Sequence, residues 1–315
     1  MASGQEVVLS RRNFIKSAGA AALFTGRRSI AQDQGIVPTM LREAATANIT
    51  IHTLRRNISV LEGSGGNIAV LTGKDGKVLV DAGFSASRSK ISASLASLSD
   101  VPITHLINTH WHIDHTDGNE WLHSSGALIV AHENTKKHLS VPTRIDAWDY
   151  NFPPSPAGGI PRITFADHHT LYLNDTLLNL RKYPSAHTDS DISVRFVEAD
   201  VLHAGDTFWN GDYPFIDYST GGSIDGSILA AEENIAKTTE QTIVIPGHGP
   251  VGNRAALIEF RDMLATIRER VAKLKKQGDT LSATLAAKPT ASFDAKWGQF
   301  LTTPAAFTKY VYQGV

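Results

Sequence analysis

Short runs of apolar and β-branched residues alternate with turns containing glycine or aspartate along much of the chain, which is typical of β-strands. In the first half of the chain, the pattern predicts strands at residues 49–55, 67–73, 77–83, 104–110 and 126–132. In the second half, it predicts a hairpin over 170–184 and strands at 192–198, 200–206 and 242–247. The strands therefore fall into two sets along the sequence.

Apolar residues at helical spacing follow each set of strands. Ile91, Leu95 and Leu98 recur on one helix face and predict a helix over residues 85–98. The same spacing predicts two further helices, over residues 226–239 and 254–277. Two sets of strands, each followed by helices, predict an α/β sandwich whose helices cover the outer faces of the sheets.

Two segments depart from this rhythm. Residues 141–162 contain five prolines and the aromatic residues Trp148, Tyr150 and Phe152, so they are either a long surface loop or lid, or an inert insertion. Residues 293–315 are rich in aromatic side chains, which either cover the core or meet a partner chain. We make no prediction of the oligomeric state.

Composition narrows the class of protein. The 315 residues carry a formal net charge of −1, so there is no basic surface of the kind that binds nucleic acid or acidic membranes. The chain has no cysteine, which excludes disulfides, thiolate metal ligands and thiol nucleophiles. The absence of cysteine does not fix the compartment, because exported proteins can fold without disulfides.

The N-terminal segment, residues 1–31, resembles a twin-arginine export signal. Arg11 and Arg12 precede a mildly apolar stretch, residues 17–26, that is too short to span a bilayer, and small residues favour cleavage after Ala31. We therefore predict a periplasmic or otherwise exported protein, with one mature domain over residues 32–315 that has no stable membrane span. Residues 1–31 hold five basic residues and one acidic residue, so their removal changes the net charge from −1 to −5. A disordered basic tail is the alternative interpretation.

Potential metal ligands are concentrated in the stretch NTHWHIDHTDGN, residues 108–119. His110, His112, Asp114 and His115 lie where a predicted strand runs into a loop. Imidazole and carboxylate groups are the ligands that zinc accepts where thiolate is lacking. Two zinc ions require about six or seven protein ligands, so further ligands must lie downstream.

Three residues at predicted strand ends supply the missing ligands. His187 lies in a loop of small residues before a strand, and Asp206 and His248 each follow a strand. A single histidine after a strand is usually structural. Four ligand-rich strand ends in one chain instead predict one shared metal site, because loops at strand ends gather at the edge of an α/β fold.

The segment HWHIDH, followed by His187, Asp206 and His248, resembles the metallo-β-lactamase superfamily of zinc hydrolases. The successive intervals are 72 residues from His115 to His187, 19 from His187 to Asp206 and 42 from Asp206 to His248. These intervals suit the order of ligands in that family. The resemblance covers roughly residues 50–250. It implies a four-layer αββα sandwich with two Zn²⁺ ions at one edge of the sheets. In this interpretation, the first ion takes His110, His112 and His187, the second takes Asp114, His115 and His248, and Asp206 bridges them.

The resemblance also implies a mechanism. Two close zinc ions lower the pKa of a shared water, so a metal-bridging hydroxide would attack the carbonyl of an ester, thioester, lactone or β-lactam in a small-molecule substrate. Asp114 would accept a hydrogen bond from the hydroxide and shuttle its proton. Asp81, in the segment LVDAG, resembles an aspartate that orients a metal ligand, and the alternative is an aspartate that caps a turn.

Alternative functions differ in the residues they require. The proven β-lactamases of the family carry Cys or Ser where Asp206 stands, and an aspartate there is more similar to glyoxalase II and lactonases. A true β-lactamase stays an alternative because export suits an enzyme that acts on antibiotics, and a non-catalytic zinc-binding protein is another. A di-iron relative would carry Glu in place of His112, and a nuclease would need a basic groove.

Aromatic residues near the predicted ligands are candidates for a substrate pocket. Trp111 and Trp209 adjoin the ligand segments, and Tyr213 and Tyr218 lie in the glycine-rich stretch after Asp206. A tyrosine hydroxyl there could donate to a developing oxyanion. The alternative for all four is core packing. The remaining histidines are predicted to be structural: His52, His105, His123, His132, His138, His168, His169 and His203.

Overall fold

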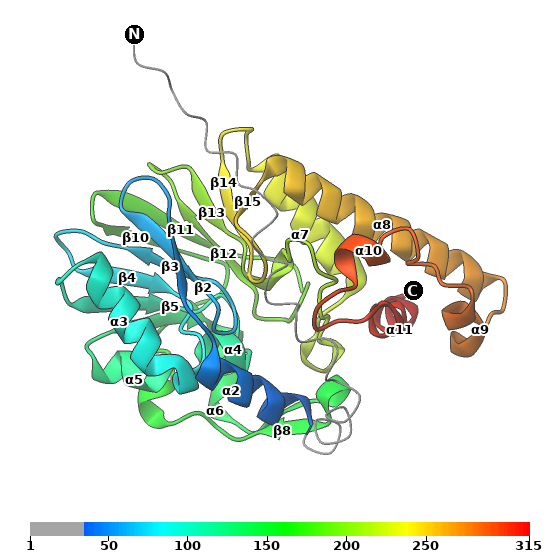
Figure 1. Cartoon of the computed structure of the whole chain (residues 1–315), viewed down its shortest axis with the longest axis horizontal. Coiled ribbons are helices and arrows are strands. Elements are labelled where there is room, and N and C mark those ends of the chain that lie inside the picture. Colours follow the sequence, from blue (N-terminus) through cyan, green and yellow to red (C-terminus); the bar gives the residue numbers. More distant parts are fainter. Residues whose placement is uncertain (1–34) are drawn as a thin grey trace, which may run out of the picture.

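The computed structural model describes residues 35–315, so the predicted export signal lies outside the described residues. Two β-sheets pack face to face, and helices cover the outer face of each sheet (Figure 1). This arrangement is the predicted four-layer αββα sandwich, and it confirms the fold class. None of the helices in residues 35–315 combines the length and apolarity that a bilayer crossing requires.

The first sheet has seven strands in the order β1-β2-β3-β4-β5-β6-β9. Their bounds are Thr50–Thr53, Ile58–Glu62, Ile68–Leu71, Lys77–Val80, Ile103–Ile107, Leu128–His132 and Ile163–Phe165. Strands β4, β5, β6 and β9 run parallel, which requires crossover connections. Helices in these connections are α3 (Arg88–Leu98), α4 (Ile113–Thr116), α5 (Asn119–Ser124) and α6 (Glu133–Ser140).

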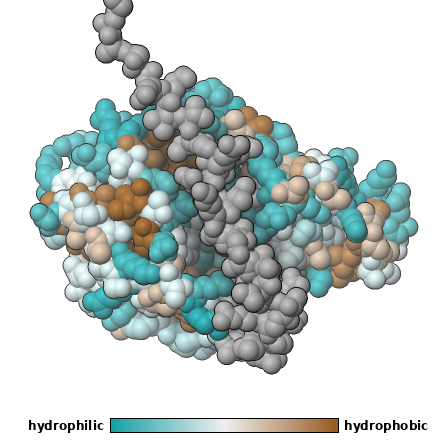
Figure 2. All heavy atoms as spheres, viewed as in Figure 1, coloured by the Kyte–Doolittle hydropathy of each residue, from teal (hydrophilic) through white to brown (hydrophobic). Residues whose placement is uncertain are grey.

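The second sheet has six strands in the order β10-β11-β12-β13-β14-β15. Their bounds are His168–Leu173, Thr176–Lys182, Ile192–Phe196, Val201–His203, Ile243–Ile245 and Gly252–Asn253. Helices α7 (Ile224–Ala236) and α8 (Arg254–Lys276) pack on its outer side. The visible face of the molecule is mainly hydrophilic, with apolar residues in small patches (Figure 2).

Successive side chains of a buried strand belong to different apolar clusters on the two faces of the sheet. Val78 and Val80 of β4 belong to the cluster between the two sheets, which also contains Val194 of β12. Leu79, between them, belongs to the cluster beneath α3 with Ile91. Because successive strand side chains point to opposite faces, one buried strand contributes to both layers.

The C-terminal region packs over the core beneath α7 and α8. Helices α9 (Leu281–Ala286), α10 (Asp294–Trp297) and α11 (Pro304–Gly314) belong to this region, whereas α2 (Ile36–Thr46), near the start of the described chain, contacts the 3₁₀ helix Ser85–Ser87. Trp297 and Phe307 are buried in the same apolar cluster as Val37 of α2. The aromatic residues of 293–315 therefore cover the core, which was one of the two predicted roles.

The structure corrects two predicted segments. The predicted strand 104–110 ends at Ile107, so His110 lies in a loop rather than on a strand. Residues 141–162, predicted as a long surface loop or lid or as an inert insertion, contain regular structure, because β7 (Thr143–Ile145) and β8 (Tyr150–Phe152) form a hairpin within them. Buried Ile145 and Phe152 hold this hairpin against the core, since their side chains join the cluster beneath α7 and α8.

Candidate metal centre

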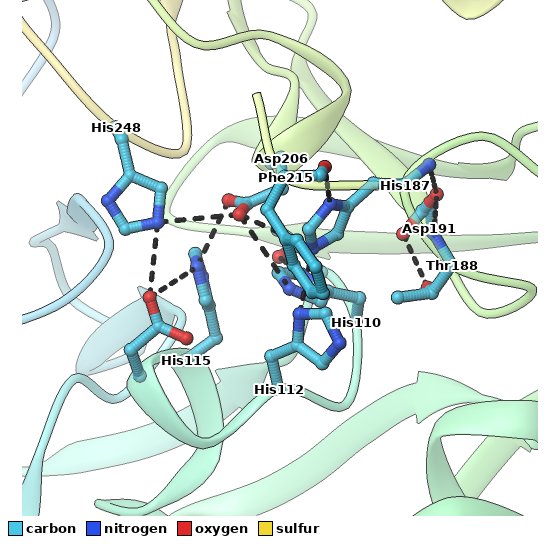
Figure 3. A network of polar contacts seen from close by, with 12 residues as sticks. His110, His112, His115, His187, Thr188, Asp191, Asp206, Phe215 and His248 are labelled. Atoms are coloured by element: carbon cyan, nitrogen blue, oxygen red, sulfur yellow. Dashed lines mark hydrogen bonds and ion pairs between the residues drawn. The ribbon is translucent and has the colours of Figure 1, made fainter. Parts of the chain in front are cut away.

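All seven predicted ligands meet at one edge of the two sheets (Figure 3). The first sheet supplies the loop after β5 and the short helix α4, which carry His110, His112, Asp114 and His115. The second sheet supplies His187 between β11 and β12, Asp206 in the turn after β13 and His248 after β14. Strand ends thus position the site, as the sequence pattern predicted.

The ligand atoms form three overlapping groups in which all atoms lie within 4.8 Å of one another. These groups are His110–His112–His187, His110–His115–Asp206 and Asp114–His115–His248. The first and third groups reproduce the two predicted ligand sets. Three ligands with an open position are what a catalytic zinc requires.

The carboxylate of Asp206 lies between the two sets. Its Oδ2 atom is 3.4 Å from Nε2 of His187 and 3.3 Å from Nε2 of His248. Its Oδ1 atom is 3.0 Å from Nε2 of His115. One carboxylate therefore reaches ligands of both sets, which fits the predicted bridging position.

Several ligand atoms lack hydrogen-bond partners although they are buried. These atoms are Nε2 of His110, Nε2 of His115 and Oδ1 of Asp206. The 3.0 Å contact between Nε2 of His115 and Oδ1 of Asp206 does not meet hydrogen-bond geometry, and buried polar atoms in proteins are almost always paired, so these three atoms need a further partner. A divalent cation satisfies imidazole nitrogens and carboxylate oxygens together, and this donor set suits zinc.

Asp81 orients two parts of the ligand loop. Its carboxylate accepts hydrogen bonds from Nδ1–H of His115 (2.8 Å), from the backbone N–H of Thr109 (2.7 Å) and from the Thr109 hydroxyl (2.7 Å). The fully buried Asp81 adopts a left-handed backbone conformation with φ 68°. This conformation costs free energy for a residue with a Cβ, so the hydrogen bonds must offset it. The contact with His115 is the one expected of an orienting aspartate.

The backbone and a second carboxylate orient the other histidines. His187 donates from Nδ1 to the carbonyl oxygen of Phe215 (2.7 Å), which leaves its Nε2 facing the site. His112 donates from Nε2 to Oδ2 of Asp217 (3.1 Å), which leaves Nδ1 facing Nε2 of His187. Asp191 accepts the backbone N–H groups of His187 and Thr188 and so holds that loop.

Neither Asp217 nor Asp191 was predicted from the sequence. Asp191 follows a loop rich in small residues and Asp217 a stretch that contains aromatic residues, and nothing in the spacing of either distinguishes it from an aspartate that caps a turn. Only their contacts with His112 and His187 identify them.

The ionisation of the two carboxylates and of two of the imidazoles favours cation binding. Burial raises the pKa of Asp206, but nearby His115 and His248 outweigh burial and hold that pKa well below its ordinary value. The same balance lowers the pKa of Asp114 to about 2. Burial lowers the pKa of His110 and of His187, so both imidazoles are neutral and keep a lone pair for a metal.

The cavity at the site has a volume of about 10 Å³. Its lining comprises Met40, His112, Asp114, Trp148, His187, Asp206, Trp209, Phe215 and Leu301. Another cavity of about 250 Å³ lies between α3 and β5, contains Lys77 and Trp121, and includes none of the seven ligands. The chemistry is therefore confined to the smaller cavity.

Of the four aromatic residues predicted to form the pocket, only Trp209 lines the cavity. Trp111 is buried and donates from Nε1 to Thr220. Tyr213 stacks on Phe307 with a centroid distance of 4.7 Å. Tyr218 packs against the same apolar cluster as Tyr213. Core packing therefore accounts for these three, and the prediction of a pocket role was wrong for them.

Histidines predicted to be structural include His132 and His203. His132 contacts the carbonyl oxygen of Ala166 through Nε2 and caps α6 through Nδ1. His203 contacts the carbonyl oxygen of Asn67. Both are therefore held by backbone groups and belong to none of the three ligand groups.

Residues 61–251 match the family model described as the metallo-β-lactamase superfamily. This match spans more than half of the chain, and the chain belongs to that superfamily. The matched region contains all seven residues of the buried His/Asp cluster.

Particular relatives show where the similarity lies. A hydroxyacylglutathione hydrolase of Polaromonas sp. (strain JS666 / ATCC BAA-500) is 27% identical over 153 residues, which cover 48% of this chain and 50% of the relative. The chain thus spans about half the length of this curated relative.

Solved structures show the same fold. A double mutant of the sec-alkyl sulfatase PisA1 superposes with a TM-score of 0.65 at 17% identity, covering 87% of this chain and 51% of the sulfatase. A metallo-β-lactamase from Pontibacter korlensis superposes with a TM-score of 0.56 at 17% identity. This alignment covers 69% of this chain and 99% of the Pontibacter protein. At these identities, the comparisons establish the fold alone.

Proposed function

We propose that this chain is a two-zinc hydrolase that cleaves an ester, thioester, lactone or β-lactam bond in a small-molecule substrate. The observation that carries this proposal is the position of Asp206 between two buried groups of three ligands, within 3.4 Å of both. Zinc ions bound there supply an activated water and polarise the carbonyl oxygen.

The residues divide between two metal positions. His110, His112 and His187 would hold one ion, Asp114, His115 and His248 the other, and Asp206 would contact both. Asp81 and Asp217 keep His115 and His112 in the orientation that binding requires, because each accepts the ring N–H that does not face the metal.

Asp114 is the proposed proton shuttle. Its Oδ2 atom lies 3.1 Å from Nε2 of His248, and its side chain lines the cavity. Because nearby His115 and His248 lower its pKa to about 2, Asp114 is ionised at neutral pH and would be able to accept a hydrogen bond from a metal-bound water.

A matched panel of substrates tests the proposal. Zinc-loaded protein would be assayed with a chromogenic cephalosporin, an acyl-homoserine lactone, a simple alkyl thioester, a glutathione thioester and a secondary alkyl sulfate. We expect turnover of at least one carbonyl substrate and its loss on addition of a chelator.

The other outcomes separate the alternatives. Rapid turnover of the cephalosporin would identify a β-lactamase despite Asp206. Turnover of the sulfate alone would overturn the carbonyl proposal. Two bound zinc ions without turnover on any member of the panel would indicate a non-catalytic zinc-binding protein.

We also propose export by the twin-arginine pathway, from Arg11 and Arg12, the apolar stretch that follows them and the small residues before the expected cleavage after Ala31. Exchange of both for lysine should retain the protein in the cytoplasm, measured by cell fractionation and immunoblotting. An unchanged distribution would contradict this proposal.

A further inference from the structure

The walls of the metal site are apolar. Above the ligands, the cavity is lined by Met40, Trp148, Trp209, Phe215 and Leu301. Among the described residues that line it, none is a lysine or arginine. The lining contributed by residues 35–315 therefore offers no cation, apart from the metal position, to an anionic group of a substrate.

Trp148 reaches the site from the tip of the β7–β8 hairpin. Ile145 pairs with Tyr150 at the end of this hairpin, and the short 3₁₀ helix Asp146–Trp148 forms the turn. The backbone N–H of Asp146 donates to Oγ of Ser219 (2.9 Å). The turn is therefore held at its N-terminal side, by the buried side chain of Ile145 and by this hydrogen bond.

Trp148 and Phe215 form a continuous apolar wall beside the ligands. Their rings stack with a centroid distance of 4.9 Å and an interplanar angle of 26°. The ring of Phe215 lies 5.8 Å from those of His112 and His187, against which Figure 3 shows it. Trp148 itself lies 5.6 Å from the ring of His112. A substrate group next to the metals must therefore contact or displace this wall.

We propose that Trp148 determines specificity and that the substrate carries an uncharged alkyl or aryl group beside the scissile bond. This inference rests on the proposed hydrolase function. Each methylene group buried against the wall should strengthen binding by about fourfold, from the transfer free energy of a CH₂ group. A carboxylate in the same place would lose its hydration without gaining a cation.

A preference for uncharged groups would make this chain differ from its curated relative, which is named as a hydroxyacylglutathione hydrolase. A glutathione thioester carries carboxylates on its leaving group, and the lining described above has no residue to pair with them. We therefore expect a simple alkyl thioester to be a better substrate than the glutathione thioester.

Two esters that differ only in a terminal charge provide the test. The full-length zinc-loaded protein would be assayed with p-nitrophenyl hexanoate and with the mono-p-nitrophenyl ester of adipate. We expect kcat/KM to be at least about tenfold higher for the hexanoate ester. Trp148→Ala should lower this ratio about tenfold, and Trp148→Lys should favour the adipate ester.

Two variants serve as controls. Trp148→Phe keeps an apolar ring and should retain the preference. Tyr172→Ala removes an aromatic side chain that is 66% exposed on β10, outside the cavity lining, and should leave both rates unchanged. Zinc content and circular dichroism would confirm that each variant is folded.

Binding of the free acids distinguishes failure of the inference from failure of the proposed function. Hexanoate and adipate would be titrated into zinc-loaded protein by calorimetry. Tighter binding of hexanoate without turnover of any ester would support the apolar site and overturn the carbonyl hydrolase. Equal or tighter binding of adipate to the wild-type protein would overturn the inference, whether or not esters are hydrolysed and whether or not Trp148→Ala folds.

Discussion

Asp217 accepts a hydrogen bond of 3.1 Å from Nε2–H of His112, a residue 105 positions earlier in the chain. The same Oδ2 atom accepts the hydroxyl of Thr220 at 2.6 Å, and Oδ1 accepts the backbone N–H of Ser219 at 3.0 Å. Trp111 completes the chain of contacts by donating to Thr220 (3.2 Å). Every oxygen of Asp217 is thus occupied by a donor, so His112 keeps one tautomer and presents Nδ1 to the site.

Asp217→Asn should therefore weaken metal binding. The amide NH₂ cannot accept a hydrogen bond, so at least one of the three donors loses its partner. We expect zinc affinity to fall by about 10- to 100-fold, as is typical when a residue that orients a ligand is changed. Competition with a chromophoric chelator measures this change. The matched control is Asp225→Asn, which alters an exposed pair with Arg268, and equal affinities in both variants would contradict the role of Asp217.

Asp81→Ala should destabilise the metal-free protein by at least about 2–4 kcal/mol, since two or more buried donors lose their acceptor. The left-handed backbone at this position adds to the cost, because alanine tolerates it poorly. Asp81→Asn, which keeps one acceptor and tolerates this conformation, should lose less. Urea unfolding of the metal-free proteins measures both. A loss of under about 1 kcal/mol for Asp81→Ala would show that the hydrogen bonds do not offset strain.

Asp114→Asn should lower kcat more than zinc content. The carboxamide can still ligate through oxygen but cannot accept a proton, so we expect kcat to fall by about 10²- to 10⁴-fold. Elemental analysis of the purified protein should show zinc content close to that of the wild type. A parallel loss of zinc and activity would instead assign Asp114 to metal binding alone.

The metal-free protein should lose stability as the pH rises from neutral. Burial lowers the pKa of His248, but Asp206 and Asp114 outweigh burial and raise it to about 9. A folded-state pKa above the ordinary 6.5 stabilises the protein fully below pH 6.5, and the contribution disappears as the pH rises through about 9. His248→Gln removes this contribution. The difference in unfolding free energy between wild type and variant should therefore shrink over this pH range, and a constant difference would contradict the raised pKa.

The metal ligands could be predicted because few side chains bind metals and their burial is costly without one. His110, His112, His187, Asp206 and His248 stand at strand ends, and parallel or paired strands bring such ends to one edge. The predicted strand 104–110, which included His110, is nevertheless too long. Both His110 and His112 lie in a loop beyond Ile107, and their rings meet at an interplanar angle of 77°.

Aromatic residues beside the ligands could not be assigned in the same way. Tyr213 follows Asp206 closely in sequence, yet it packs on Phe307 and donates to Asp294. Burial of an aromatic ring is favourable in the core and in a pocket alike, so sequence proximity to a ligand does not separate the two.

The sequence by itself therefore predicted an α/β sandwich and the seven candidate ligands, because strand periodicity and metal-ligand chemistry are local properties of residue type and spacing, and the family resemblance of the ligand motif implied the four-layer arrangement. Only the tertiary structure decided which apolar residues enclose the site. Met40, Trp148 and Leu301 come from three distant segments and share no local pattern. Hydrophobic contact is non-directional, so the packing of the whole chain, rather than any one segment, selects the wall that a substrate meets.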